Sequence, residues 1–180
     1  MRTDRSFLES LIEQASEIET LIQARYRVYC LTTKPDSILM WSHYADRHRG
    51  ICLEFDTANT VFSTALKVEY LDAYRPLDLS DNSAATTLLP LITKSAPWRY
   101  EDEYRLIAEE KSAASGHDAL IAENGFLAFP RDALKSVIVG CAVSDAAREE
   151  LRRIVDRSGH TLALKMARRI PNRYALTIGP

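Results

Sequence analysis

The sequence has 180 residues, of which 46% are hydrophobic and 27% charged, values typical of one globular domain with a sizeable core. Its formal net charge of −2 does not attract nucleic acid to the protein as a whole. Nucleic acid could bind only at a local basic patch. No apolar run approaches the roughly 18 residues of a membrane span, and the N-terminus carries no secretory signal. We therefore expect a cytoplasmic protein that has no membrane partner.

The first half of the chain alternates predicted helices and strands. Apolar residues at three- and four-residue steps predict an amphipathic helix over Ser6–Tyr26. Asp36 or Ser37 can cap a short helix that runs to about Arg49, where Gly50 ends it. Runs of β-forming residues predict strands over residues 26–33, 51–56 and 66–71.

The second half contains more predicted strands than helices. A helix is predicted over Ala84–Ser95 despite Pro90, and another begins at Ser144 and runs to about Asp156. Asn124-Gly125 is the strongest two-residue hairpin signal. The predicted strands cover residues 103–110, the hairpin 119–129, and residues 135–143, 161–170 and 173–178.

This order of elements predicts an α+β fold with a mainly antiparallel sheet and flanking helices. Residues 1–180 read as a single domain, with the helix in residues 1–26 and a mixed sheet core in residues 27–180. We expect one sheet to hold residues 51–56, 66–71, 103–110 and 135–143. The most buried residues are expected to include Val137, Ile138 and Val139.

The cysteines predict free thiols. Cys30, Cys52 and Cys141 are odd in number, widely spaced and flanked by apolar residues, which favours a reducing compartment. No two of them have the short spacing of zinc ligands, so we expect no metal.

A first candidate cluster lies in the stretch Leu39–Asp56, which is crowded with aromatic and ionisable residues. His43 and His48 are five residues apart, so they do not form the i, i+4 pair of helical zinc sites. His43 and Tyr44 are candidate catalytic residues, because histidine changes protonation near neutral pH and tyrosine can stack on a base or ribose. The alternative is that the aromatic residues fill the core while the histidines bond to backbone. The candidate substrate-binding residues here are Trp41, Arg47 and His48.

A second candidate cluster is Trp98–Arg105. If this segment enters a strand, Glu101, Glu103 and Arg105 share one face and are candidate catalytic residues, with Trp98 a substrate contact. The alternative is an exposed, ion-paired strand without a chemical role.

Three segments carry a resemblance to a known family: ILMWSHYADRHRGICLEFD, KSAPWRYEDEYRLI and LKSVIVGCAVS. In order and spacing they resemble the bacterial family 2971 of domains of unknown function, associated with AbiG-type abortive-infection proteins. The likeness covers about Val28 to Ile178 and implies a bacterial cytoplasmic setting and a role in phage defence. Members usually begin with a longer segment that includes an Asn-Asp-Pro-Phe-like motif, which this sequence lacks. We therefore expect a short variant or a chain without its beginning.

The Glu-x-Glu pattern also resembles ADP-ribosyltransferases, in which a glutamate at this place orients the ribose of NAD. That likeness implies NAD as the cofactor and His43, Tyr44 and Glu103 as the site. Our leading hypothesis is a nucleotide- or NAD-using transferase, with Glu103 facing a cleft shared with His43 or Tyr44 and held by Arg105. The alternatives are a non-catalytic module that binds a protein or nucleic-acid partner in a defence or toxin–antitoxin system, and an inactive remnant.

Overall fold

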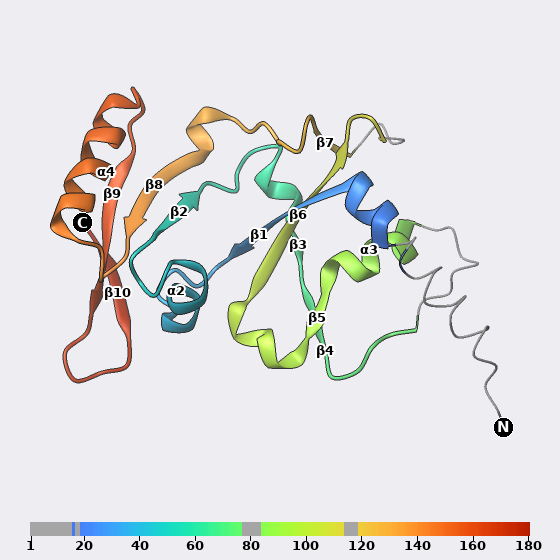
Figure 1. Ribbon diagram of the computed structural model, residues 1–180, viewed down its shortest axis with the longest axis horizontal. Coiled ribbons are helices and arrows are strands. Elements are labelled where there is room, and N and C mark those ends of the chain that lie inside the picture. The colour runs from blue at the N-terminus through green and yellow to red at the C-terminus, as the bar shows by residue number, and fades with distance from the viewer. Residues whose placement is uncertain (1–15, 17–18, 77–83, 114–118) are drawn as a thin grey trace. The chain divides into compact units, whose positions relative to one another are not determined.

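A computed structural model of the protein describes residues 16, 19–76, 84–113 and 119–180 (Figure 1). Most of the helix predicted over Ser6–Tyr26 lies outside the described residues, and residues 19–25 are helical as expected. The chain divides into two compact units. The first contains residues 1–29 and 106–128, and the second contains residues 30–105 and 129–180.

The second unit has a four-stranded sheet with the order β10-β9-β8-β2. Its strands are β2 (Ile51–Phe55), β8 (Leu134–Val139), β9 (Ala163–Arg169) and β10 (Leu176–Gly179). Strands β8 and β9 are parallel, whereas β2 and β10 pair antiparallel with their neighbours. The crossover between β8 and β9 is helix α4 (Asp145–Arg157), which lies alongside β9 (Figure 1). Parallel strands need such a crossover, so the sequence order fixes the position of α4.

The core of this unit forms where helix α2 (Ile38–Tyr44) packs on the sheet. Its buried residues are Trp41, Ala45, Ile138, Ala167 and Leu176. The predicted burial is confirmed, since the relative exposures are 6% for Val137, 2% for Ile138 and 0% for Val139. The strand predicted over residues 135–143 ends earlier, at Val139. The cysteines Cys30, Cys52 and Cys141 are free.

The other strands form two further sheets, and β1 (Tyr26–Thr32) and β6 (Glu103–Glu110) have residues in both units. Strand β6 neighbours β1, and its Tyr104 and Arg105 pair antiparallel with β3 (Leu66–Lys67). Strand β4 (Glu69–Leu71) pairs in parallel with β5 (Thr93–Ser95). The remaining elements are helix α3 (Ala84–Ile92) and the 3₁₀ turns η1 (Phe62–Thr64), η2 (Ala96–Glu101) and η3 (Arg131–Ala133).

In the first unit, the Ala108–Glu110 part of β6 pairs in parallel with β7 (Leu120–Ala122). The predicted turn is confirmed, since Asn124 and Gly125 have φ of 54° and 81°. The second strand of the predicted hairpin reduces to one bridge between Glu123 and Phe126. The carboxylate of Glu110 orders this turn by accepting hydrogen bonds from the Asn124 and Gly125 amides, at 2.8 and 3.0 Å.

The α+β class is confirmed, but two details of the sheet prediction are wrong. The described strands pair in both directions rather than mainly antiparallel, and residues 51–56 share a sheet with residues 135–143 but not with 66–71 or 103–110. The predicted strand over residues 66–71 breaks at Val68. This residue is buried and its amide donates to the Glu103 carbonyl at 2.9 Å, so the chain turns from β3 into β4 there.

Two predicted helices are shorter than expected. The helix predicted to reach Arg49 ends at Tyr44, because Asp46, Arg47 and His48 have φ of 44°, 54° and 69°. The helix predicted over Ala84–Ser95 ends at Ile92, and the next residues pair with β4 instead. Within the described ranges, every helix is too short or too polar to cross a membrane.

Candidate functional site

The two candidate clusters meet in the second unit. Tyr44, the last residue of α2, donates a hydrogen bond from its hydroxyl to Glu101 Oε1 at 2.8 Å. The ring centroids of His43 and Trp98 are 6.2 Å apart in an edge-on arrangement. The segments that contain these residues are more than fifty positions apart in the chain, so their convergence is a product of the fold.

Lys94 joins the two glutamates and was missed by the sequence analysis. Its ammonium contacts Glu101 Oε2 and lies 2.9 Å from Glu103 Oε2. Strand β5 positions Lys94 by pairing it with Tyr70 of β4. One signal could have found it, since Lys94 is the only charged residue between Asp81 and Arg99 in an otherwise uncharged stretch.

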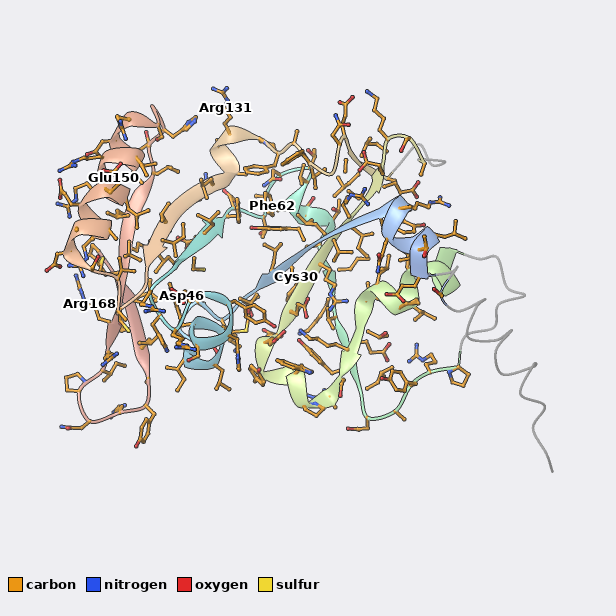
Figure 2. The ribbon with its side chains drawn as sticks, in the orientation of Figure 1. Cys30, Asp46, Phe62, Arg131, Glu150 and Arg168 are labelled. Atoms are coloured by element: carbon orange, nitrogen blue, oxygen red, sulfur yellow. The ribbon has the colours of Figure 1, made fainter. Side chains whose placement is uncertain are left out.

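Arg105 holds the second glutamate as predicted. Its Nε lies 2.8 Å from Glu103 Oε1, and its Nη1 donates to the Leu91 carbonyl at 2.7 Å. The two residues are two positions apart on β6, so their side chains share one face. Cys30 of β1 adds a thiol hydrogen bond to Glu103, and Figure 2 labels it beside this strand. We call Lys94, Glu101, Glu103 and Arg105 the carboxylate cluster.

Both carboxylates of the cluster are buried. The relative exposure is 1% for Glu101 and 3% for Glu103. Glu101 was expected on the same strand as Glu103, but it is the last residue of the η2 turn. Asp102, with a φ of 45°, then turns the chain into β6. Buried charges persist only when they are paired and hydrogen-bonded, and each glutamate here contacts the shared ammonium.

These contacts fix the protonation states at neutral pH. Burial raises the pKa of Glu103, but hydrogen bonds from Arg105, Cys30 and Lys94 outweigh it and bring the pKa down to about 2. Burial lowers the pKa of Lys94, but its bonds to Glu101 and Glu103 raise it above its ordinary value overall. Burial and then the bond to Glu101 raise the pKa of Tyr44 to about 12.

A group acts well as a general acid or base when its pKa lies near the working pH. Glu103 and Tyr44 are far from that range on opposite sides. The cluster is therefore suited to electrostatic and hydrogen-bonding roles, and its formal charges balance, with two carboxylates against Lys94 and Arg105.

The other candidates of the first cluster have structural contacts. Trp41 is 3% exposed in the core, and its indole nitrogen donates to the Pro35 carbonyl at 2.7 Å. His48 Nε2 lies 3.0 Å from Ser42 Oγ, while its Nδ1 is buried and has no partner among the described residues. Arg47 is exposed in the left-handed turn after α2.

An aromatic surface lies beside the cluster. We define the aromatic face as His43, Tyr44 and Trp98. Tyr44 is 62% exposed and Trp98 is 39% exposed, and His43 is exposed between them. Lys94 Nζ lies 5.1 Å from the centroid of the Trp98 ring, a cation–π distance that helps to hold the indole.

The described residues offer no group of three or more His, Cys, Asp or Glu side chains that could hold a metal ion. The aromatic face offers ring surfaces for stacking, and the carboxylate cluster offers hydrogen-bond acceptors that are already engaged. The sequence suggested both stacking on a base or ribose and proton transfer. This arrangement supports stacking of a ligand ring more directly than proton transfer.

Comparisons with curated proteins and with solved structures found no match. The likeness to ADP-ribosyltransferases therefore stays a prediction. Residues 40–106 match the model of a family described as Protein of unknown function (DUF2971). That segment holds both candidate clusters and Lys94. Over residues 40–106, the chain is therefore similar to this family of unknown function.

Proposed function

We propose that the protein is a nucleotide-binding module that stacks the base of its ligand on the aromatic face. The observation that carries this proposal is the exposure of Trp98 and Tyr44 while both side chains are held by residues of the carboxylate cluster. Tyr44 is tied to Glu101, and Trp98 lies under the Lys94 ammonium. Aromatic rings that are ordered before binding lose little conformational entropy when they stack on a base.

The carboxylate cluster holds two residues of the aromatic face, Tyr44 through Glu101 and Trp98 through Lys94. The hydrogen bond from Tyr44 to Glu101 links the end of α2 to the η2 turn, because the two residues come from these two elements. A nucleobase would then meet a preformed surface. Base–aromatic stacking contributes about 1–3 kcal/mol per base.

Calorimetric titration with ATP and with NAD tests this proposal. We expect binding by the parent protein and an affinity at least about tenfold lower for Trp98→Ala, since 1.4 kcal/mol corresponds to a factor of ten. The matched control is Tyr174→Ala, which removes a fully exposed ring elsewhere in the same unit. The proposal would be refuted if the parent protein did not bind either ligand, or if Trp98→Ala and the control bound with equal affinity.

A second candidate is the NAD-using transferase of the sequence analysis. The observation that favours it is the bond between Tyr44 and Glu101, which brings the two candidate catalytic segments together. Glu103→Gln is a poor test because Glu103 is buried in ion pairs. Tyr44→Phe removes one hydroxyl and its bond to Glu101 but no charge, so we expect NAD turnover by the parent and reduced turnover by the variant at an unchanged far-UV spectrum. A parent that does not consume NAD would exclude this candidate.

The setting that we propose is phage defence in bacteria, and it is supported by the resemblance to the family associated with abortive infection. Plaque counts on cells that express the parent protein or Trp98→Ala test it. We expect fewer plaques with the parent than with the variant at equal protein levels.

A further inference from the structure

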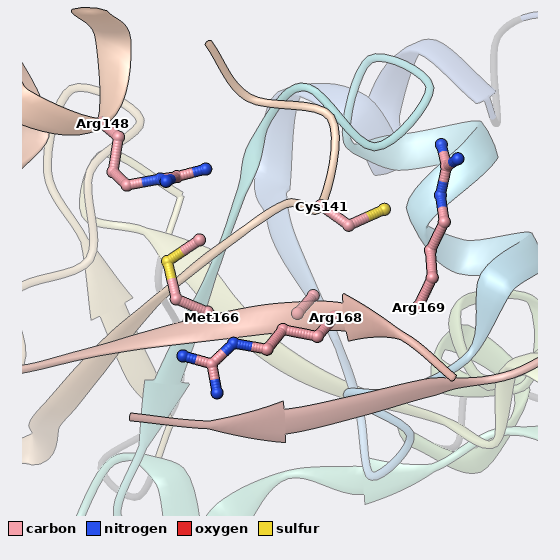
Figure 3. Close-up of a pocket in the computed structure, with 6 residues that line it drawn as sticks. Cys141, Arg148, Met166, Arg168 and Arg169 are labelled. Carbon is pink, nitrogen blue, oxygen red and sulfur yellow. The ribbon is translucent and has the colours of Figure 1, made fainter. Parts of the chain in front are cut away.

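A groove lined by arginines lies in the second unit, outside the segment that matches the family. One cavity of about 440 Å³ is lined by residues of β9, by Cys141 and by Arg148 of α4 (Figure 3). A second, of about 380 Å³, extends along α4. The two cavities share Arg148, Met166 and Arg168 as lining residues, and we call them together the arginine groove. Volumes of this size are typical of sites for small ligands.

The lining of this arginine groove is strongly cationic. It includes four arginines and one carboxylate, that of Asp156, so the formal charge of these groups is four minus one, or +3. The protein as a whole carries −2, so the charge of the groove is opposite in sign to the net charge of the protein. The arginines are Arg148, Arg152, Arg168 and Arg169.

Helix and strand geometry place these groups together. Arg148 and Arg152 are four residues apart on α4 and therefore share a face of the helix. Met166 and Arg168 are two residues apart on β9 and share a face of the strand. Arg148, Met166 and Arg168 are among the residues that line the cavity drawn in Figure 3.

The guanidinium groups are only partly satisfied by the protein. Arg148 Nη1 lies 3.2 Å from Asp145, but its Nε is buried and has no hydrogen-bond partner among the described residues. Arg168 donates from Nη2 to the main-chain oxygen of Pro180. A guanidinium has five N–H donors in a fixed fork that matches phosphate oxygens. Arg148 and Arg168 therefore keep guanidinium N–H groups that no described residue accepts, and an anion in the groove can accept them.

We propose that the arginine groove binds a phosphorylated small molecule through a pyrophosphate group, with Arg148 and Arg168 as its principal ligands. Arginine pairs with phosphate oxygens through two parallel hydrogen bonds, and two such side chains on opposite walls can hold two linked phosphates. This site is separate from the aromatic face in its residues and does not depend on the proposed base stacking.

Titration with inorganic pyrophosphate, and with ATP, tests the site at constant ionic strength. We expect pyrophosphate to bind the parent protein and to raise its melting temperature, whereas potassium chloride at equal ionic strength does not. The double variant Arg148→Gln, Arg168→Gln is expected to bind at least about tenfold more weakly. The matched control is Arg153→Gln, Arg157→Gln, which removes two charges from α4 that do not line the groove.

A second measurement uses the unmutated protein, so it does not depend on the folding of a variant. Phenylglyoxal modifies exposed guanidinium groups, and peptide mass spectrometry resolves the site of modification. We expect pyrophosphate to protect Arg168 and to leave Arg153 unprotected. Equal protection of both residues, or no protection, would overturn the proposal. So would binding of a single-stranded oligonucleotide without a response to pyrophosphate or ATP, which would assign the groove to nucleic acid.

Discussion

Replacement of Glu103 by glutamine should destabilise the protein by about 3 kcal/mol at neutral pH. Glutamine keeps the shape of the side chain but removes the charge that Lys94 and Arg105 share. The pKa of Glu103 is about 2, against an ordinary value of 4.5. A difference of one in pKa between the folded and unfolded chain corresponds to about 1.4 kcal/mol, so the charged form contributes on the order of 3 kcal/mol. This value agrees with the cost of about 3–5 kcal/mol that is typical for the loss of one partner from a buried ion pair.

The same lowered pKa fixes the pH dependence. A carboxyl group whose pKa is lower in the folded state stabilises the fold fully above its ordinary pKa, and this contribution is lost as the pH falls toward 2. Between pH 7 and about pH 3.5 the parent should lose about 1.4 kcal/mol through Glu103, and the variant should not. The difference in unfolding free energy between the two proteins should therefore narrow from about 3 to about 2 kcal/mol.

Urea unfolding of both proteins at the two pH values, followed by tryptophan fluorescence, measures this difference. The matched control is Glu69→Gln, which breaks a half-exposed ion pair with Arg75 and should cost less than about 1 kcal/mol at either pH. A Glu103→Gln protein as stable as the parent at pH 7 would refute the reasoning. So would a difference that stays constant with pH.

Two further predictions concern Cys30 and Gly140. Burial and then the bond to Glu103 raise the pKa of Cys30 from 9.0 to about 11, so its thiolate fraction at pH 8 is roughly a hundredfold lower than that of an ordinary thiol. Alkylation by iodoacetamide, followed by peptide mass spectrometry, should be slow at Cys30 and faster in Glu103→Gln. Gly140→Ala would place a Cβ 2.2 Å from the His48 carbonyl oxygen, so thermal or urea unfolding should show a loss of about 1–3 kcal/mol. Gly179→Ala meets nothing closer than 3.8 Å and should be nearly neutral in the same assay.

Elements with a strong local signal were predictable from the sequence. The apolar residues Val137, Ile138 and Val139 predicted a buried strand, and Ser144 caps α4 by accepting from the Ala147 amide at 3.3 Å. The Asn124-Gly125 turn followed from the preference of these residues for positive φ. In each case the local chemistry and the tertiary environment favour the same conformation.

The carboxylate cluster could be predicted only in part. The pairing of Glu103 with Arg105 follows from alternation along a strand, because both residues lie within β6. The role of Lys94 does not follow, because it stands at the end of a sequence that favours helix and becomes part of β5 only by pairing with β4. Two- and three-residue strands such as β3 and β5 have almost no intrinsic signal. Their tertiary partners determine them.

The three left-handed residues after α2 change how the most distinctive part of the sequence should be interpreted. Each non-glycine residue in that conformation costs roughly 1–2 kcal/mol, and Asp46, Arg47 and His48 adopt it in succession. The turn is retained because the His48 carbonyl accepts the Ala142 amide at 3.0 Å and the Gly50 amide bonds to Ala45 at 2.8 Å. The pattern Ala-x-x-His-x-Gly thus encodes a backbone path. A library of substitutions at these positions should enrich glycine and asparagine and deplete valine and isoleucine, whatever ligand is used for selection.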